Sequence, residues 1–190
     1  SPSLPVVRLR DDDRARIKQV LDAGAQSLVI PMIETAEQAG RAMRATRYPP
    51  EGIRGIGSSL ARASRFSSVP DYLTTANDQI CLILQVESRA GLAALDDILA
   101  INGIDCVFIG PADLAADMGH LGNAGHPEVR AAVLDALARI AASGKAAGML
   151  STEEGFIADC VKAGARFVGV GIDVVAYVGA MRTLARKYVS

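Results

Sequence analysis

The sequence lacks several features that would place it in a specialised class of protein. Among its 190 residues it has no tryptophan, four phenylalanines, four tyrosines and two histidines. Its 20 basic and 21 acidic residues leave a formal charge of -1, which gives no overall field to attract nucleic acid or an acidic membrane. No apolar run approaches the roughly 18 residues of a membrane span, and no secretory leader pattern opens the chain. We therefore expect neither nucleic acid nor a membrane as a partner.

Cysteine is also scarce. Cys81, Cys106 and Cys160 are odd in number, far apart and embedded in apolar segments, so they predict reduced core thiols of a cytoplasmic protein and not a zinc motif. The composition, 50% hydrophobic and 22% charged, is that of an ordinary globular protein. We expect residues 1–190 to form a single domain with one core.

Two apolar runs, residues 81–84 and 106–109, are each followed by an acidic side chain. Gln85 and Glu87 follow the first run, and Asp113 follows the second. Continuous apolar runs are typical of strands buried on both faces, and parallel neighbours place their carboxyl ends at one rim. Two carboxylates at such a rim predict a divalent metal site. The alternative is that Glu87 and Asp113 merely cap the helices that follow.

The chain alternates between strand and helix patterns. We expect strands near 4–8, 27–31, 81–87, 106–110, 147–150 and 167–171. We expect helices over 11–23, 36–46, 69–77, 90–100, 112–118, 127–142, 152–163 and 173–188. A long loop over 48–66 interrupts the pattern, and a loop of that length is more often functional than idle. The alternation predicts a parallel sheet with right-handed crossovers, either doubly wound or closed into a barrel.

The barrel is favoured because no strand is followed by a phosphate-binding Gly-x-Gly-x-x-Gly turn. A barrel would also gather Arg8, Gln85, Glu87, Asp113 and Leu150 at one mouth, where the carboxyl ends of its strands meet. A barrel of this kind has eight strands and the sequence shows six. We therefore expect the first two strand-helix units to be missing from this chain.

Five segments together carry a family resemblance. They are Pro5-Val-Val-Arg8, Tyr48-Pro-Pro-x-Gly-Ile-Arg-Gly, Gln85-Val-Glu87-Ser, Gly110-Pro-Ala-Asp-Leu-Ala-Ala-Asp-Met-Gly119 and Gly122-Asn-x-x-His126-Pro. Over its whole length the sequence resembles the HpcH/HpaI aldolase family. The resemblance implies an α/β fold, a (β/α)8 TIM barrel of the phosphoenolpyruvate/pyruvate superfamily. It also implies a metal-dependent (class II) pyruvate aldolase of aromatic compound catabolism. Such an enzyme reversibly cleaves 4-hydroxy-2-oxo acids, such as 4-hydroxy-2-oxoheptanedioate, to pyruvate and an aldehyde, such as succinic semialdehyde.

The resemblance also assigns roles to particular residues. Glu87 and Asp113 match the metal carboxylates, for which we expect Mg2+, Mn2+ or Co2+. Gln85, Ala112 and Asp113 match the positions that bind the pyruvate part of the substrate. Arg8 matches the arginine that stabilises the transition state, although such a residue at a strand end is often a plain surface arginine.

Two expected catalytic features depend on the resemblance alone. Asp22 matches an acid that makes a catalytic histidine more basic. Without the resemblance, Asp22 would be interpreted as a solvated residue of a helix. The family's histidine lies upstream of this sequence, and neither His120 nor His126 matches it. Leu150, at a strand end, is expected to help set aldehyde specificity, with core packing as the alternative. No lysine sits at a strand exit, which disfavours a Schiff-base aldolase.

Three other functions are compatible with the sequence. One is a 2-dehydro-3-deoxyglucarate-type aldolase, another a citrate-lyase-like or malyl-CoA-lyase-like carbon-carbon lyase, and a third a non-catalytic barrel that binds an oxo acid. The resemblance implies a homo-oligomer, a hexamer built as a trimer of dimers, in which C-terminal helices cross between neighbours. Arg54, Arg62 and Arg65 lack the interleaved aromatics of a nucleic-acid site, so we expect them to bind the protein's own carboxylates or a neighbouring subunit.

Overall fold

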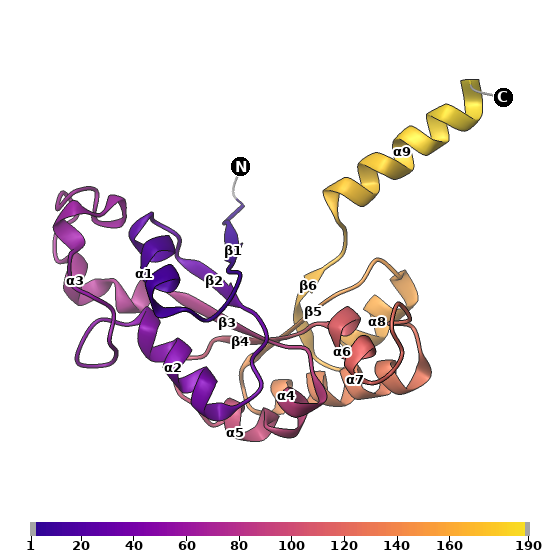
Figure 1. Ribbon diagram of the computed structural model, residues 1–190, viewed down its shortest axis with the longest axis horizontal. Helices are drawn as coiled ribbons and strands as arrows, with labels where there is room; N and C mark the ends of the chain where they lie inside the picture. The colour runs from indigo at the N-terminus through magenta and orange to yellow at the C-terminus, as the bar shows by residue number, and fades with distance from the viewer. Residues whose placement is uncertain (1–2, 189–190) are drawn as a thin grey trace.

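The computed structural model describes residues 3–188, which form a six-stranded parallel sheet with helices on one of its faces (Figure 1). The strands are β1 (Val6–Arg8), β2 (Ser27–Ile30), β3 (Cys81–Val86), β4 (Cys106–Ile109), β5 (Ala146–Leu150) and β6 (Ala165–Gly169). They pair in chain order, and every pair is parallel. The predicted six-stranded parallel sheet is therefore confirmed, with β1 and β6 at its edges.

The helices lie between consecutive strands, except the last helix, which follows β6. They are α1 (Arg14–Asp22), α2 (Ala36–Thr46), α3 (Tyr72–Thr75), α4 (Arg89–Ala93), α5 (Leu95–Leu99), α6 (Pro111–Asp117), α7 (Pro127–Ala142), α8 (Glu154–Lys162) and α9 (Asp173–Tyr188), with the 3-10 turns η1 (Ser58–Leu60), η2 (Arg62–Ser64) and η3 (Asn77–Gln79). None of the helices in residues 3–188 has the length and hydropathy needed to cross a membrane.

Local capping explains where several helices begin. The Asp13 side chain accepts a hydrogen bond from the N–H of Arg16 at the start of α1, and Thr35 does the same for α2. Pro127 occupies the first turn of α7, where its missing N–H leaves no intrahelical bond unmade. The sequence pattern placed these starts correctly or within a few residues.

Two predicted helices differ from the structure. The helix expected over 69–77 is reduced to the single turn of α3, followed by η3. The helix expected over 90–100 is divided into α4 and α5 at Ala94, whose ψ of 2° departs from helical geometry. No glycine or proline marks that break, so the sequence gives no local signal for it.

The main core lies between the sheet and its helices. Alternate strand residues such as Leu28, Leu82, Leu84, Val107 and Met149 point to this layer and are fully buried. The intervening strand residues Val29, Ile83 and Cys106 form a second, smaller cluster on the other face. A strand with apolar residues on both faces appears in the sequence as an unbroken apolar run, and this pattern predicted the strands.

The last helix stands apart from this core. Figure 1 shows α9 extending away from the sheet, and none of its residues is buried. Its exposed side chains include Val174, Val175, Tyr177, Met181 and Leu184. No residue of α9 is therefore packed into the core of the described chain.

Candidate metal and oxo-acid site

Five residues predicted from the sequence line one cavity. Arg8, Gln85, Ala112, Asp113 and Leu150 surround a space of about 470 Å³ at the carboxyl ends of the strands. Arg8 is the last residue of β1, Gln85 belongs to β3, Asp113 is in the first turn of α6, and Leu150 ends β5. The parallel sheet thus gathers the ends of strands that are far apart in sequence, as expected.

Glu87 lies directly beneath this cavity. It follows the end of β3, and only 2% of its surface is exposed. A Cβ placed on Gly110, which lines the cavity, would approach Glu87 Oε2 to 2.5 Å. The absence of a side chain at Gly110 therefore leaves the space into which the Glu87 carboxylate fits.

A chain of hydrogen bonds fixes the polar side chains. Arg8 Nε donates to Gln85 Oε1 at 3.0 Å, and Gln85 Nε2 donates to Glu87 Oε2 at 2.6 Å. The backbone N–H of Met32 donates to Glu87 Oε1 at 3.0 Å. Arg8 Nη2 lies 3.9 Å from Glu87 Oε1, at the limit of an ion pair. Each carboxylate oxygen has two lone pairs, and the bonds from Gln85 and Met32 occupy one acceptor site on each oxygen of Glu87.

Met32 was not singled out from the sequence. Its φ of 55° is in the left-handed region, which is uncommon for a residue with a side chain and is associated with functional sites. This backbone conformation accompanies the N–H bond to Glu87. A methionine after Pro31 carries no sequence signal for such a role, so only the structure could reveal it.

The surroundings of Glu87 act on the pKa of its carboxyl group in opposing directions, and their net effect is to raise it. Burial raises the pKa of the Glu87 carboxyl above its ordinary value, whereas the Met32 N–H holds it down. The Asp113 carboxyl, close enough to form a hydrogen bond, also raises that pKa, and Arg8 opposes it. Two carboxyl groups this close, one of them buried, repel each other when ionised. Their shared charge is only partly balanced by Arg8.

These residues fit a divalent cation. A buried carboxylate, a second carboxylate beside it and an open cavity in front are features of sites for hard cations, which take a few protein oxygens and complete their coordination with water or substrate. The predicted ligands Glu87 and Asp113 are therefore brought together, and the alternative that they serve only as helix caps loses support. In α4 the capping hydrogen bond comes from Ser88.

The remaining walls of the cavity are apolar. Val6, Val29 and Phe167 point into it, and Phe108 contacts Phe167 edge to face with ring centroids 5.9 Å apart. Apolar walls lower the local dielectric and strengthen charge interactions inside.

Asp22 is not brought to this site. α1 runs back from the carboxyl end of β1, so its last residue Asp22 lies toward the amino ends of the strands. There its carboxylate binds Arg54 Nη2 at 2.8 Å and pairs with Lys18. The structure thus gives Asp22 a role in holding Arg54, and we do not include it among the residues of the cavity.

A second group of side chains could also hold a metal. His120, His126 and Glu128 place one ligand atom each within 4.8 Å of one another. The centroids of the two imidazole rings are 3.5 Å apart, His120 Nε2 is 2.9 Å from Glu128 Oε2, and the His126 side chain caps α7. This group is partly exposed and lines none of the walls of the cavity, so its geometry is not that of a site facing the substrate space.

The chain matches known proteins over nearly its whole length. Residues 1–180 match the HpcH/HpaI aldolase/citrate lyase family. The chain belongs to this family. A protein of Roseovarius nubinhibens named hydroxypyruvate/pyruvate aldolase is 57% identical over 186 residues, which are 98% of this chain and 72% of that protein. A Klebsiella pneumoniae protein named 4-hydroxy-2-oxo-heptane-1,7-dioate aldolase is 52% identical over 187 residues, 98% of this chain and 71% of that protein.

Solved structures of the HpcH/HpaI family share the fold. The crystal structure of a family protein from Burkholderia cenocepacia superposes with a TM-score of 0.93 at 40% identity, covering 100% of this chain and 75% of that one. An HpcH/HpaI aldolase from Desulfitobacterium hafniense superposes with a TM-score of 0.84 at 28% identity, covering 96% of this chain and 71% of that one.

Proposed function

We propose that the chain is a carbon-carbon lyase, a class II aldolase that uses a divalent ion to cleave 4-hydroxy-2-oxo acids reversibly to pyruvate and an aldehyde. One observation carries the proposal. The buried carboxylate of Glu87 lies beside Asp113 and is linked through Gln85 to Arg8, and these three neighbours of Glu87 line one cavity. The substrates follow from the relatives, which are named for pyruvate, hydroxypyruvate and 4-hydroxy-2-oxo-heptane-1,7-dioate.

The reaction makes specific demands on the site. As the bond between C3 and C4 breaks, its electron pair moves toward the 2-oxo group, and the 4-hydroxyl loses its proton to a base as the aldehyde forms. Charge that develops on the 2-oxo oxygen must be stabilised where it appears. A divalent ion held by Glu87 and Asp113 would act there as a Lewis acid. Two carboxylates leave coordination positions open for substrate and water, which suits Mg2+, Mn2+ or Co2+. A structural zinc site is instead closed by its protein ligands.

Arg8 contributes a fixed positive charge. Its Nε is held by Gln85, which orients the guanidinium plane, while its side chain remains 53% exposed toward the cavity. Nη1 also donates to the Leu9 carbonyl at 3.4 Å, and the N–H groups that neither Gln85 nor Leu9 engages can donate to the carboxylate or the 2-oxo oxygen of the substrate. Each charge-assisted hydrogen bond contributes about 1.5–3 kcal/mol. Arg8 is the catalytic residue of the proposal, Gln85 positions it, and Ala112 borders the oxo-acid part.

The base that takes the proton of the 4-hydroxyl is not among the described residues that line the cavity. Neither of the two histidines lines the cavity in residues 3–188. The proposal gives this step to the histidine that the family carries upstream of the matching segment. It also treats the six-stranded sheet as an arc of an eight-stranded barrel, which the extra length of the relatives supports.

The aldehyde would lie toward the outer part of the cavity. Leu150 is 36% exposed and borders the space on the side away from Arg8's strand. Its side chain would set how large or polar an aldehyde can be. Succinic semialdehyde is one candidate, and the relatives named hydroxypyruvate/pyruvate aldolase favour a second substrate on the oxo-acid side, hydroxypyruvate.

We also propose that the enzyme is a cytoplasmic homo-oligomer, a hexamer of three dimers. The three cysteines are free thiols, which fits a reducing compartment. The unburied apolar residues of α9 fit contact with a neighbouring subunit. Sedimentation at several concentrations measures the assembly state, and a variant with Val175 and Met181 both changed to serine should shift it toward smaller species.

The experiment that tests the proposed chemistry uses the whole protein stripped with a chelator. Pyruvate release from 4-hydroxy-2-oxoheptanedioate is followed with and without added Mg2+, Mn2+ or Co2+, and exchange of the pyruvate methyl protons in D2O reports enolisation without an aldehyde. Glu87→Gln should lower both rates by about 10²–10³-fold, the size of effect seen when a transition-state charge partner is removed.

A matched control changes a carboxylate outside the cavity. Glu37 is 83% exposed on α2 and pairs with Arg41, so Glu37→Gln should leave both rates unchanged. Activity that survives the chelator, or that Glu87→Gln leaves intact, contradicts the metal mechanism. Metal-dependent binding of pyruvate without proton exchange would instead indicate a non-catalytic oxo-acid-binding protein.

A further inference from the structure

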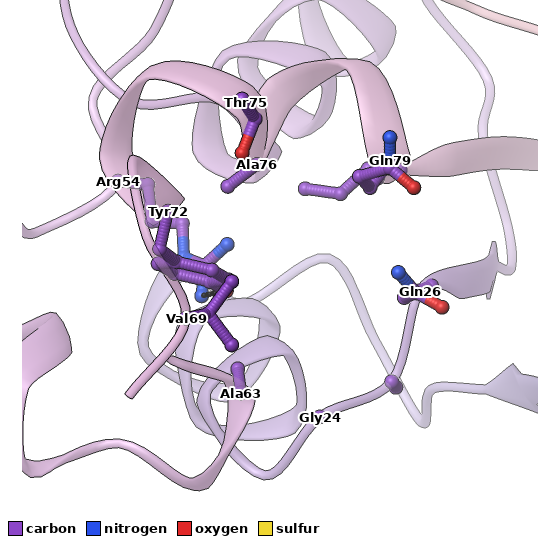
Figure 2. Close-up of a pocket in the computed structure, with 11 residues that line it drawn as sticks. Gly24, Gln26, Arg54, Ala63, Val69, Tyr72, Thr75, Ala76 and Gln79 are labelled. Carbon is purple, nitrogen blue, oxygen red and sulfur yellow. Dashed lines mark hydrogen bonds between the residues drawn. The ribbon is translucent and has the colours of Figure 1, made fainter. Parts of the chain in front are cut away.

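A second cavity lies at the opposite end of the sheet from Glu87. It measures about 280 Å³. None of the residues around it also lines the cavity of Arg8, Gln85 and Asp113, which we call the oxo-acid cavity. Gln26 precedes β2 and Ile80 precedes β3, so the cavity borders the amino ends of these strands. Figure 2 shows Arg54 and Tyr72 on one side of the open space, with Gln26 and Gln79 across from them.

Arg54 is the unusual feature of this cavity. The residue is 2% exposed, although it carries a full charge. Its Nη2 donates to Asp22 Oδ1 at 2.8 Å and to the Tyr72 hydroxyl at 3.4 Å, and its guanidinium lies 4.4 Å from the centre of the Tyr48 ring. Its Nε–H is buried without a hydrogen-bond partner in the described part of the chain. Buried donors on charged groups are ordinarily satisfied, and an exception calls for an explanation.

The charge around Arg54 is not balanced. Asp22 is the carboxylate that pairs with it, and the same carboxylate also pairs with Lys18. One negative charge therefore serves two cations, which leaves an excess positive charge at the cavity wall. An arginine that retains free donors beside a cavity presents a planar fork suited to oxyanions.

The other walls limit what could enter. The volume lies just below the range of about 300–1,000 Å³ typical of drug-sized ligands, so a nucleotide or coenzyme is too large. Ala63 and Val69 on one side of the space and Ala76 on another supply apolar surface, and Thr75, Gln26 and Gln79 supply polar groups (Figure 2). A compact anion of a few carbons, or inorganic phosphate, matches both the size and this mixture.

We propose that this cavity is a second, non-catalytic binding site for a small oxyanion, held by the guanidinium of Arg54. The shared chemistry is a carboxylate or phosphate group, and the source is either free phosphate or a small organic acid. The site is independent of the aldolase proposal, because its residues belong to different elements and a different end of the sheet. Occupancy would complete the hydrogen bonds of Arg54 and stabilise the loop between α2 and β3.

The test measures binding by calorimetry at fixed ionic strength. Inorganic phosphate and pyruvate are titrated separately into the chelator-stripped whole protein that carries Arg8→Gln, so that the oxo-acid cavity contributes no arginine. We expect saturable binding of at least one of the two, with a Kd of about 1 mM or lower, corresponding to a modest free energy for a ligand this small. The two titrations distinguish a phosphate site from an organic-acid site.

Two variants and one control connect binding to the cavity. Arg54→Lys keeps the charge but removes the fork, and Ala76→Leu fills the space without altering Arg54, since Ala76 points into the cavity (Figure 2). Each should weaken binding by about tenfold or more, which is one decade of Kd. Arg62→Gln removes an exposed positive charge that does not line this cavity and should leave the Kd unchanged.

Ala76→Leu keeps the test sharp if Arg54→Lys fails to fold, and thermal unfolding without ligand reports the folding of both. Binding that disappears with Arg8→Gln overturns the inference, as does binding that Ala76→Leu leaves unchanged. Absence of saturable binding of both probes also overturns it. None of these results bears on whether the Glu87 site cleaves oxo acids.

Discussion

Gly110→Ala should damage the proposed metal site through one added methyl group. The new Cβ would lie 2.5 Å from Glu87 Oε2, 2.9 Å from Gln85 Nε2 and 2.9 Å from Glu87 Cβ. Contacts this short cannot persist, so one of these groups must move. The φ of Gly110 is -97°, which alanine adopts without strain, so the substitution acts through crowding alone.

The size of the effect of Gly110→Ala follows from the contacts that hold the Glu87 side chain. Its carboxylate is nearly sealed from solvent and receives hydrogen bonds from Gln85 at 2.6 Å and from the Met32 N–H at 3.0 Å. Displacement of the Glu87 carboxylate strains or breaks at least its hydrogen bond from Gln85. Overpacking of a tight interior site typically destabilises a protein by about 1–3 kcal/mol. Because Glu87 moves, we expect metal affinity and kcat/KM to fall by about tenfold or more, which corresponds to about 1.4 kcal/mol or more.

Gly40→Ala is the matched control. Gly40 lies inside α2, and a Cβ there meets no atom within 4 Å. Alanine in an open helical position should raise stability by about 0.4–1 kcal/mol and leave activity unchanged. The measurements are urea unfolding for stability, titration of Mn2+ into the stripped protein for affinity, and steady-state pyruvate release. If Gly110→Ala binds metal and turns over like the unaltered protein, the assignment of this glycine as the space for Glu87 is refuted.

Three further predictions concern other residues. Gln85→Leu should lower kcat/KM by about 10–100-fold, because Arg8 loses a charged hydrogen bond of about 1.5–3 kcal/mol, and unchanged kinetics would refute its positioning role. Burial raises the pKa of Cys106 to about 12 and that of Cys160 to about 11, so both should resist alkylation at pH 8 in the folded protein and react once urea unfolds it, as mass spectrometry would show. Leu150→Ala should change the ranking of aldehydes accepted in the aldol direction while leaving pyruvate proton exchange intact, and an unchanged ranking would count against its role in specificity.

Much of the fold could be predicted because its signals are local. The apolar run before Gln85 and the run ending at Ile109 read as buried parallel strands, and both are. Once the strands are parallel, the convergence of Arg8 and Asp113 on one rim follows from topology. The residues that line the cavity could therefore be anticipated without coordinates.

What the sequence could not supply are contacts that depend on backbone conformation. The left-handed Met32 brings an N–H to Glu87 although nothing about a methionine predicts it. The pairing of Arg54 with Asp22 joins residues 32 positions apart through an irregular loop. The sequence predicts that the three loop arginines bind the protein's own carboxylates or a neighbouring subunit; Arg54 pairs with Asp22, while Arg62 and Arg65 are exposed.

Asp22 lies away from the oxo-acid cavity in the described structure, and its expected effect on a catalytic histidine stays a prediction. The Asp22 side chain pairs with Arg54 at the amino end of the sheet, whereas the carboxylate that lies near Arg8 is that of Glu87. Glu87 and Arg54 are opposite in charge but alike in situation, since each is about 2% exposed and only partly balanced by its neighbours. Burial of an incompletely compensated charge is unfavourable, so it persists where something else completes the balance. For Glu87 the chemistry of the donors points to a cation, and for Arg54 the same reasoning points to an anion.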